Sequence, residues 1–164
     1  MIFVDTNVLL YAIDNSEPDK RDMARNWLDV LWSASTGLTS TQVLNEYYVN
    51  ATQKVRFGLT MEAARKTVKS LYNWNPRAID CELIDHAHEI QTRYRLSWWD
   101  SLIAAAAIGQ RATMLLSEDL HDGLDLDGTV VRSPFKFSPD DLPQAPASKL
   151  NQPRARYTRQ RKVT

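Results

Sequence analysis

The first ten residues constrain the fold more than any other stretch of the chain. Residues 2–4 form an apolar run of Ile, Phe and Val, which is typical of a strand buried on both faces. The run stops at Asp5, and an apolar helical pattern follows over residues 8–12. A strand that ends in a carboxylate and turns into a helix places that carboxylate at the carboxyl edge of an open α/β sheet, where such folds bind ligands. The same place also suits a helix cap, and Asp5, Thr6 and Asn7 are all suitable capping residues.

Segments with strand and helix patterns alternate along the rest of the chain. Residues 37–40, 113–116 and 129–132 have the composition of short buried strands, and residues 78–81 fit either a strand or a loop. Apolar residues recur at helical spacing over residues 18–35, 41–57, 60–72, 83–94 and 97–107. Because strands separated by helices favour parallel pairing, the pattern predicts an α/β fold with a central parallel sheet.

Length and composition indicate one folded domain followed by a tail. A chain of 164 residues with 43% hydrophobic and 24% charged residues is ordinary for one globular domain with a substantial core. After Phe137 the sequence becomes rich in Pro, Gln, Ala and Arg and loses its periodicity. We therefore expect residues 1–137 to form the domain and residues 138–164 to form a flexible tail.

The formal net charge of zero hides an asymmetry between the domain and the tail. From residue 143 onwards there is no acid, and the six bases are Lys149, Arg154, Arg156, Arg159, Arg161 and Lys162. Of the 20 bases in the chain, 14 remain against 20 acids, so residues 1–142 carry a formal charge of about −6. An acidic body is not typical of a general nucleic-acid binder. A nucleic acid would instead have to be held at a narrow local site.

Two further features bear on the protein's location. Cys81 is the only cysteine, which excludes an internal disulfide framework and a cysteine-rich zinc site and fits a reducing cytosol. No stretch approaches the roughly 20 apolar residues of a membrane span. Asp5 interrupts the N-terminal apolar run, so we expect no signal peptide. The sequence therefore predicts a cytoplasmic protein without a membrane segment.

Acidic residues lie at the ends or flanks of several predicted elements. Asp119 follows the strand predicted over residues 113–116, and a parallel sheet would bring it to the same edge as Asp5. Glu46 lies on the flank of an apolar helical stripe. Asp100 lies in the first turn of a helix, where the spacing from Ser97 also fits a capping box. Each acid alone has an ordinary explanation as a cap or a solvated charge.

Taken in order, these acids resemble the pattern of the PIN-domain nucleases, and most closely the VapC-type toxins of type II toxin–antitoxin modules. The resemblance covers residues 1–137 and rests chiefly on four stretches: Asp5-Thr6-Asn7, Asn45-Glu46, Trp99-Asp100-Ser101 and Leu116-Ser117-Glu118-Asp119-Leu120. It implies a three-layer α/β/α domain with a central parallel sheet that binds Mg²⁺ or Mn²⁺ through clustered acids and cuts RNA. The tail after Phe137 departs from the family's usual pattern.

The resemblance implies a role for each matching residue. Asp5 and Asp100 would be the main metal ligands, and Glu46 and Asp119 would complete the catalytic and metal-binding set. Asp122 is a further candidate metal ligand, at a position that varies among these toxins, and Thr6 or Asn7 would orient the first carboxylate or touch a substrate phosphate. Oxygen ligands of this kind suit Mg²⁺, and one or two such ions activate water for attack on a phosphodiester. The product would carry a 5′-phosphate and a 3′-hydroxyl.

The resemblance also implies two partners. One is an RNA substrate, and the other is an antitoxin protein, encoded by the neighbouring gene, that silences the site by inserting an Arg side chain among the acids. Proteins of this family commonly form homodimers, so the resemblance also implies a homodimer. The aromatic residues Trp27, Trp32, Tyr47 and Tyr48 exceed what one helical stripe needs to bury, so they would serve either that interface or the core.

Two other functions fit parts of the pattern. A haloacid-dehalogenase-like phosphatase also begins with a strand that ends in Asp, but it needs a second Asp where this chain has Asn7. The other alternative is a binding protein and not an enzyme: a non-catalytic PIN-like module that binds RNA or protein through its shape alone. The presence of all four acids favours the nuclease over the binding module.

Overall fold

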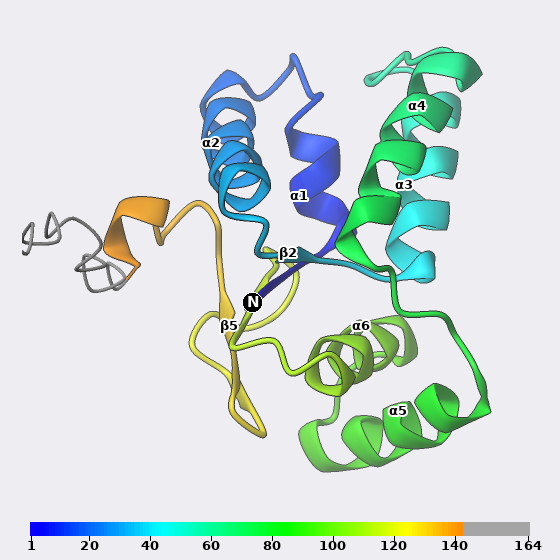
Figure 1. Cartoon of the computed structure of the whole chain (residues 1–164), viewed down its shortest axis with the longest axis vertical. Helices are drawn as coiled ribbons and strands as arrows, with labels where there is room; N and C mark the ends of the chain where they lie inside the picture. The colour runs from blue at the N-terminus through cyan, green and yellow to red at the C-terminus, as the bar shows by residue number, and fades with distance from the viewer. Residues whose placement is uncertain (143–164) are drawn as a thin grey trace, which may run out of the picture.

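The structure, a computed structural model, describes residues 1–142 and has a five-stranded sheet at its centre (Figure 1). The strands are β1 Ile2–Val4, β2 Gly37–Leu38, β3 Met114–Leu116, β4 Asp125–Leu126 and β5 Thr129–Arg132. Their order in the sheet is β2-β1-β3-β5-β4, and every neighbouring pair is parallel except β4 and β5. The predicted α/β fold with a central, mostly parallel sheet is thus confirmed.

The antiparallel edge strand β4 is the part of the sheet that the sequence did not predict. Asp125 and Asp127 have the residue type of a turn before Gly128, but Asp125 pairs with Val130 as part of a two-residue strand. Asp127 and Gly128 both have positive φ, at 52° and 95°, as a tight hairpin turn requires. A strand this short has too few residues to produce a recognisable alternation.

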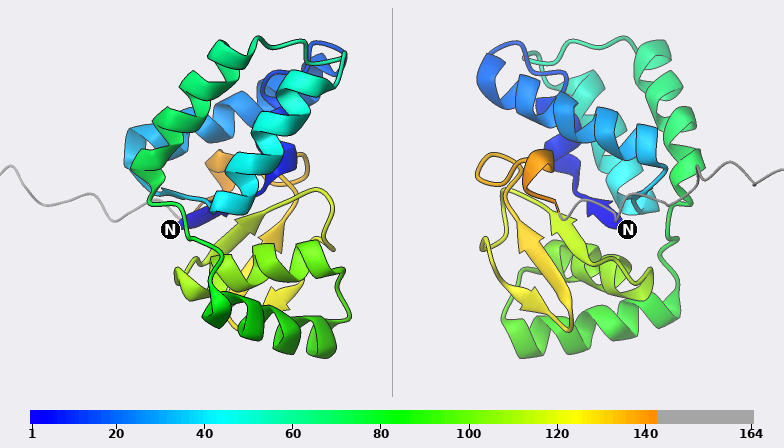
Figure 2. Two further views of the ribbon diagram at one scale, coloured as in Figure 1. Left: turned by 90° about the vertical axis from the view of Figure 1, so that its right-hand side faces the viewer. Right: turned by 60° about the vertical axis from the view of Figure 1, so that its left-hand side comes forward.

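Over residues 1–142, six α-helices and two 3₁₀ turns surround the sheet. The helices are α1 Thr6–Tyr11, α2 Pro18–Ala34, α3 Thr41–Gln53, α4 Met61–Leu71, α5 Cys81–Tyr94 and α6 Trp98–Gly109, and the turns are η1 Tyr72–Trp74 and η2 Pro139–Asp141. Helices α1–α4 lie on one side of the sheet and the α5–α6 pair on the other (Figure 2). The helical predictions are confirmed to within a few residues. Residues 78–80 form a loop that leads into α5.

Side-chain caps explain where most of these helices begin. Ser40, Thr60, Asp80 and Ser97 each accept a hydrogen bond from a backbone N–H in the first turn of α3, α4, α5 and α6, respectively. Such a bond satisfies one of the donors that the start of a helix leaves free. The cap on α6 bears on the site, because Ser97 bonds to Asp100.

The core fills both spaces between the sheet and its helices. On one side lie the fully buried Trp27 of α2 and Tyr47 of α3, and on the other the buried alanines 104–107 of α6. Two of the four aromatic residues considered for a dimer interface are therefore core residues. Trp32 is 38% exposed and packs against the ring of Trp74, at 4.9 Å between centroids. None of the helices described is long and apolar enough to cross a bilayer.

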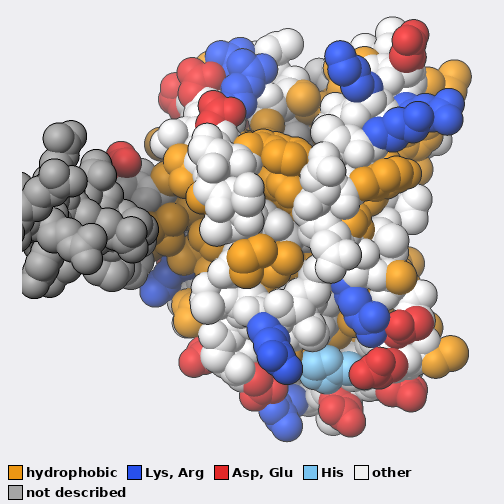
Figure 3. All heavy atoms as spheres, in the orientation of Figure 1, with side chains coloured by type: hydrophobic (Ala, Val, Ile, Leu, Met, Phe, Trp, Pro, Cys, Tyr) orange, Lys and Arg blue, Asp and Glu red, His pale blue; other side chains and the backbone are white. Residues whose placement is uncertain are grey.

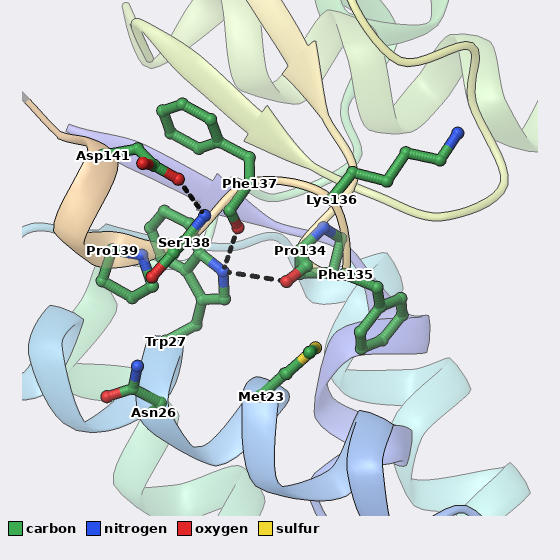
Figure 4. A pocket seen from close by; sticks show the side chains of 10 residues that line it. All are labelled: Met23, Asn26, Trp27, Pro134, Phe135, Lys136, Phe137, Ser138, Pro139 and Asp141. Atoms are coloured by element: carbon green, nitrogen blue, oxygen red, sulfur yellow. Dashed lines mark hydrogen bonds between the residues drawn. The ribbon is translucent and has the colours of Figure 1, made fainter.

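The packed part of the chain continues past Phe137 to Leu142. Figure 4 shows this segment as far as Asp141. The indole Nε1 of Trp27 donates to the carbonyls of Pro134 and Phe137, at 3.2 and 3.1 Å, and its ring stacks on that of Phe137. Ser138 then caps η2 in a capping box. A hollow of about 240 Å³ lies beside this segment, and none of the site acids described below lines it. Residues 143–164, most of the predicted tail, lie outside the described residues.

Candidate active site

The site lies where β1 and β3 end side by side. Val4 pairs with Leu116 in parallel register, and the backbone N–H of Asp5 donates to the Leu116 carbonyl at 3.0 Å. The next residue on each strand, Asp5 and Ser117, must therefore meet at the carboxyl edge of the sheet. Asp119 follows two residues later in the loop after β3. The topology alone thus brings Asp5 near Asp119.

Asp5 is almost completely buried, with 7% of its surface exposed, and both carboxylate oxygens accept hydrogen bonds. Oδ1 accepts from the backbone N–H of Thr6 at 2.6 Å, so Asp5 does cap α1. Oδ2 accepts from the Ser117 hydroxyl at 2.7 Å and from the Asn7 amide at 3.0 Å. The capping role and a role in the site are therefore compatible, because they use different oxygens.

The Asn7 amide lies between two carboxylates. Its Nδ2 is 3.0 Å from Oδ2 of Asp5 and 3.0 Å from Oδ2 of Asp119. A positively polarised N–H₂ group thus holds together two acids that would otherwise repel each other. The Oδ1 of Asn7 accepts a longer bond, 3.4 Å, from the backbone N–H of Glu118.

Burial raises the pKa of Asp5 from its ordinary value of 3.8 to about 7. The hydrogen bonds from Ser117 and Thr6 act in the opposite direction because they favour the ionised form, and the charges of Asp119 and Glu46 raise the pKa further. A buried carboxylate surrounded by like charges is a typical feature of functional sites. It is also the electrostatic situation that a bound cation relieves.

Glu46 joins this edge from α3. The Thr6 hydroxyl donates to its Oε2 at 2.7 Å, and the amide of Gln42 donates to its Oε1 at 2.9 Å. Gln42 lies one helical turn before Glu46, and its amide also donates to the backbone carbonyl of Trp99 at 3.3 Å. Gln42 therefore links the Glu46 side to the start of α6.

Asp100 lies at the start of α6. The Ser97 hydroxyl donates to its Oδ2 at 2.7 Å, while its own backbone N–H donates to Ser97 Oγ at 3.2 Å. Gln42 and the Trp99 backbone connect this turn to Glu46. The Oδ1 of Asp122 accepts from the backbone N–H of Ser133 at 2.9 Å and so ties the loop after β3 to the end of β5.

These contacts decide which predicted site residues meet. Asp5, Asn7 and Asp119 form one hydrogen-bonded group, and Thr6 connects it to Glu46. Within residues 1–142, no three Asp, Glu, His or Cys side chains are arranged to hold a metal ion. Asp5 and Asp119 nevertheless fit Mg²⁺ by their chemistry. Their donors are all oxygen, and Mg²⁺ is commonly held by one or two carboxylates together with waters and substrate phosphates.

Sequence reasoning missed two residues that position the acids and one that holds the neighbouring loop. Ser117 donates to Asp5, and its place directly after a buried strand was the available signal. Gln42 lies four residues before Glu46, a spacing at which helix side chains meet. Lys20 has no sequence signal: it reaches from α2 to pair with Glu118, and its Nζ donates to the Tyr11 hydroxyl at 3.2 Å.

Glu46 and Asp119 line a hollow of about 280 Å³ that also contains positive charge. Its other lining residues include Lys54, Arg56 and Phe57. Arg56 pairs with the fully buried Asp14 but keeps 48% of its side chain exposed. On the face shown in Figure 3, basic side chains are scattered among acidic ones. Lys54 and Arg56 thus place positive charge beside Glu46 and Asp119 without forming part of an extended basic surface on that face.

A model of the PIN domain family matches residues 2–121 of the chain. The chain belongs to the PIN-domain family. The match spans Asp5, Glu46, Asp100 and Asp119 and ends before Asp122. No curated protein matches the sequence.

Solved structures of toxin–antitoxin proteins have a similar fold. A toxin–antitoxin complex from Klebsiella pneumoniae matches with a TM-score of 0.60 at 19% identity, over 84% of this chain and 99% of that one. VapBC2 from Rickettsia felis, bound to a promoter DNA fragment, matches at 0.56 and 20% identity over 80% and 98%. VapC20 from Mycobacterium tuberculosis, a toxin that cleaves the sarcin–ricin loop, matches at 0.52 and 18% identity over 78% and 92%. The protein is thus a PIN-domain protein with a VapC-like fold.

Proposed function

We propose that the protein is a cytoplasmic endoribonuclease that depends on Mg²⁺ or Mn²⁺ and acts as the toxin of a toxin–antitoxin pair. The observation that carries the proposal is the Asp5–Asn7–Asp119 group at the carboxyl edge of the sheet. There, the buried carboxylate of Asp5 is joined through Asn7 to Asp119, which lines a hollow that also contains Lys54 and Arg56. The PIN family match and the similar fold of an RNA-cleaving toxin support the reaction class.

In this proposal each residue has a physical task. Asp5 and Asp119 would hold the cation, Glu46 and Asp100 would complete the acidic set, and Asp122 is a further candidate ligand. The ion supplies charge neutralisation at the scissile phosphate. Ser117, Thr6 and Asn7 fix the carboxylates in place through the bonds described above. Lys54 lies where it would neutralise a neighbouring phosphate of the strand.

The proposed partners follow from the same comparison. Two structures with this fold are VapBC-type or toxin–antitoxin complexes, which supports an antitoxin encoded beside this gene. A cationic side chain of that partner inserted among the acids would silence them by occupying the place of the ion. A homodimer is also proposed.

One observation favours the alternative function, a non-catalytic PIN-like module that binds RNA or protein. In the part of the chain that the structure describes, Asp100 bonds to Ser97, and no three Asp, Glu, His or Cys side chains are arranged to hold a metal ion. If this arrangement persists when RNA is bound, the metal-binding set stays incomplete. Activity measurements distinguish the two functions.

The decisive variant is Asp100→Asn. Asn can still occupy the first turn of α6, so the fold should survive, while the negative charge is lost. Purified wild type should cut structured RNA in Mg²⁺ or Mn²⁺ and stop in EDTA, and Asp100→Asn should lose cleavage by at least a hundredfold. Glu62→Gln is the matched control, because it removes an acid from the first turn of another helix, α4, and should cut like wild type. Equal cleavage by Asp100→Asn and wild type would remove Asp100 from the mechanism.

A further inference from the structure

A second hollow, of about 480 Å³, lies beside the acids between α3 and the start of α6. Three large apolar side chains form much of its wall: Val49 from α3, Ile79 from the loop before α5, and Trp99 from α6. All three are exposed, at 45%, 40% and 61%, respectively. An exposed cluster of this kind next to a functional site is a characteristic of ligand-binding surfaces.

The exposed Trp99 differs from its neighbour Trp98. The ring of Trp98 packs on the ring of His88, at 4.6 Å between centroids. Trp99 has no aromatic or cationic partner within residues 1–142, and its backbone carbonyl is fixed by Gln42. The result is a flat apolar face on a well-anchored segment, directly beside Asp100.

The hollow adjoins the acidic site. Glu46 and Asn50, one helical turn apart on α3, line both hollows and form the ridge between them. On one side of this ridge are Asp119 and Lys54, which are charged. On the other side the walls are apolar, and the polar groups other than Glu46 are the amides of Gln42, Asn45 and Asn50.

We propose that this second hollow binds an unpaired base of single-stranded RNA, stacked on the indole of Trp99, while the adjoining phosphate lies in the acidic site. The inference rests on the proposed function and names a subsite for its substrate. An aromatic face suits any base, and stacking contributes substantially to the affinity of proteins for single-stranded nucleic acid. An anionic ligand group is disfavoured, because the only charge on the wall is the negative charge of Glu46.

The amides along α3 give the subsite a means of reading the base. The Asn45 side chain makes no hydrogen bond within the described part of the chain, and Asn50 uses only its Nδ2, which donates to the Glu46 carbonyl at 2.7 Å. Both side chains thus retain hydrogen-bonding groups for a base edge. The ridge geometry would place the base and its phosphate on opposite sides of Glu46.

The test measures RNA binding in EDTA, so that it does not depend on cleavage. Fluorescence anisotropy should compare a short single-stranded RNA of mixed sequence with an abasic ribose-phosphate strand of the same length. We expect Trp99→Ala to weaken binding of the RNA about tenfold, within the range known for loss of one base–aromatic stack. The same variant should leave the weaker binding of the abasic strand unchanged, and Trp99→Phe should restore most of the affinity. Tyr72→Ala is the matched control, because Tyr72 is an aromatic residue with 59% exposure that lines neither hollow.

Each outcome decides one point. Equal RNA affinity of Trp99→Ala and wild type would overturn the subsite, and so would a wild type that does not distinguish RNA from the abasic strand. If Trp99→Ala instead loses only its binding to the co-expressed product of the neighbouring gene, the hollow belongs to a protein partner. If the wild type cuts no RNA but binds it through Trp99, the nuclease proposal fails while the subsite stands.

Discussion

Replacing Asp5 by Asn should change how the stability of the protein depends on pH. The native carboxyl has a pKa raised from 3.8 to about 7 by burial, with a further contribution from Asp119 and Glu46. The native state therefore holds more protons than the unfolded state between these values, and stability must fall as pH rises through that window. The increase in the pKa of Asp5 corresponds to about 4 kcal/mol of unfolding free energy, at 1.36 kcal/mol per pKa unit.

Most of this loss falls in a range that is simple to measure. For the single group, linkage predicts that about 2.5 kcal/mol of unfolding free energy disappears between pH 5 and pH 8. Asn does not titrate, so Asp5→Asn should lack this component and should equal or exceed the wild type in stability at pH 8. Urea denaturation in EDTA at several pH values gives both curves, and their difference cancels the titration of all other groups that the two proteins share.

The control and the metal arm complete this test. Asp29→Asn removes an exposed acid of α2 and should follow the wild-type curve. At pH 8, about 10 mM Mg²⁺ should stabilise the wild type by roughly 1.4 kcal/mol for a dissociation constant near 1 mM, and Asp5→Asn should lose most of this gain. Parallel pH curves for the wild type and Asp5→Asn would refute the account of Asp5 as a strained, buried acid.

Three further outcomes are expected. Gly37→Ala should destabilise the fold by roughly 1–3 kcal/mol in urea denaturation, because an added Cβ would lie 2.4 Å from the buried ring of Trp74; an unchanged midpoint would contradict this packing. The six bases of residues 143–164 should contribute about four to six phosphate contacts, so deletion of this segment should make the slope of log binding constant against log salt concentration less steep by about 3 to 5. An unchanged slope would show that the segment takes no part in RNA binding. Light scattering at tens of micromolar should show a dimer, and a monomer alone would reject it.

The strands and helices were predictable because their patterns are strong and local. The alternation of apolar strands with capped helices placed the sheet, and the strand-to-helix junction at Asp5 placed its functional edge. The register of β1 against β3 then follows from parallel pairing, and with it the approach of Asp5 to Asp119. The short antiparallel β4 was missed because two residues provide no periodicity.

The positions of Glu46 and Asp100 could not be deduced in the same way. Each lies on a helix whose tilt and rotation are set by packing over long sequence separations, which a local pattern does not record. Asp100 bonds to Ser97 within its own helix turn, so its capping role was visible in the sequence and its distance from Asp5 was not. The contacts of Trp27 with Pro134 and Phe137 likewise extend the packed chain to Leu142, where composition alone predicted a tail.

The chemistry of the cleaved ends is the most direct test of the central claim, a cation-dependent hydrolysis at the Asp5–Asp119 edge. Mass spectrometry of the fragments from a cleaved RNA should show 5′-phosphates and 3′-hydroxyls in Mg²⁺, and no fragments in EDTA or with Asp119→Asn. Fragments that end in 2′,3′-cyclic phosphates, or cleavage that persists in EDTA, would contradict the account.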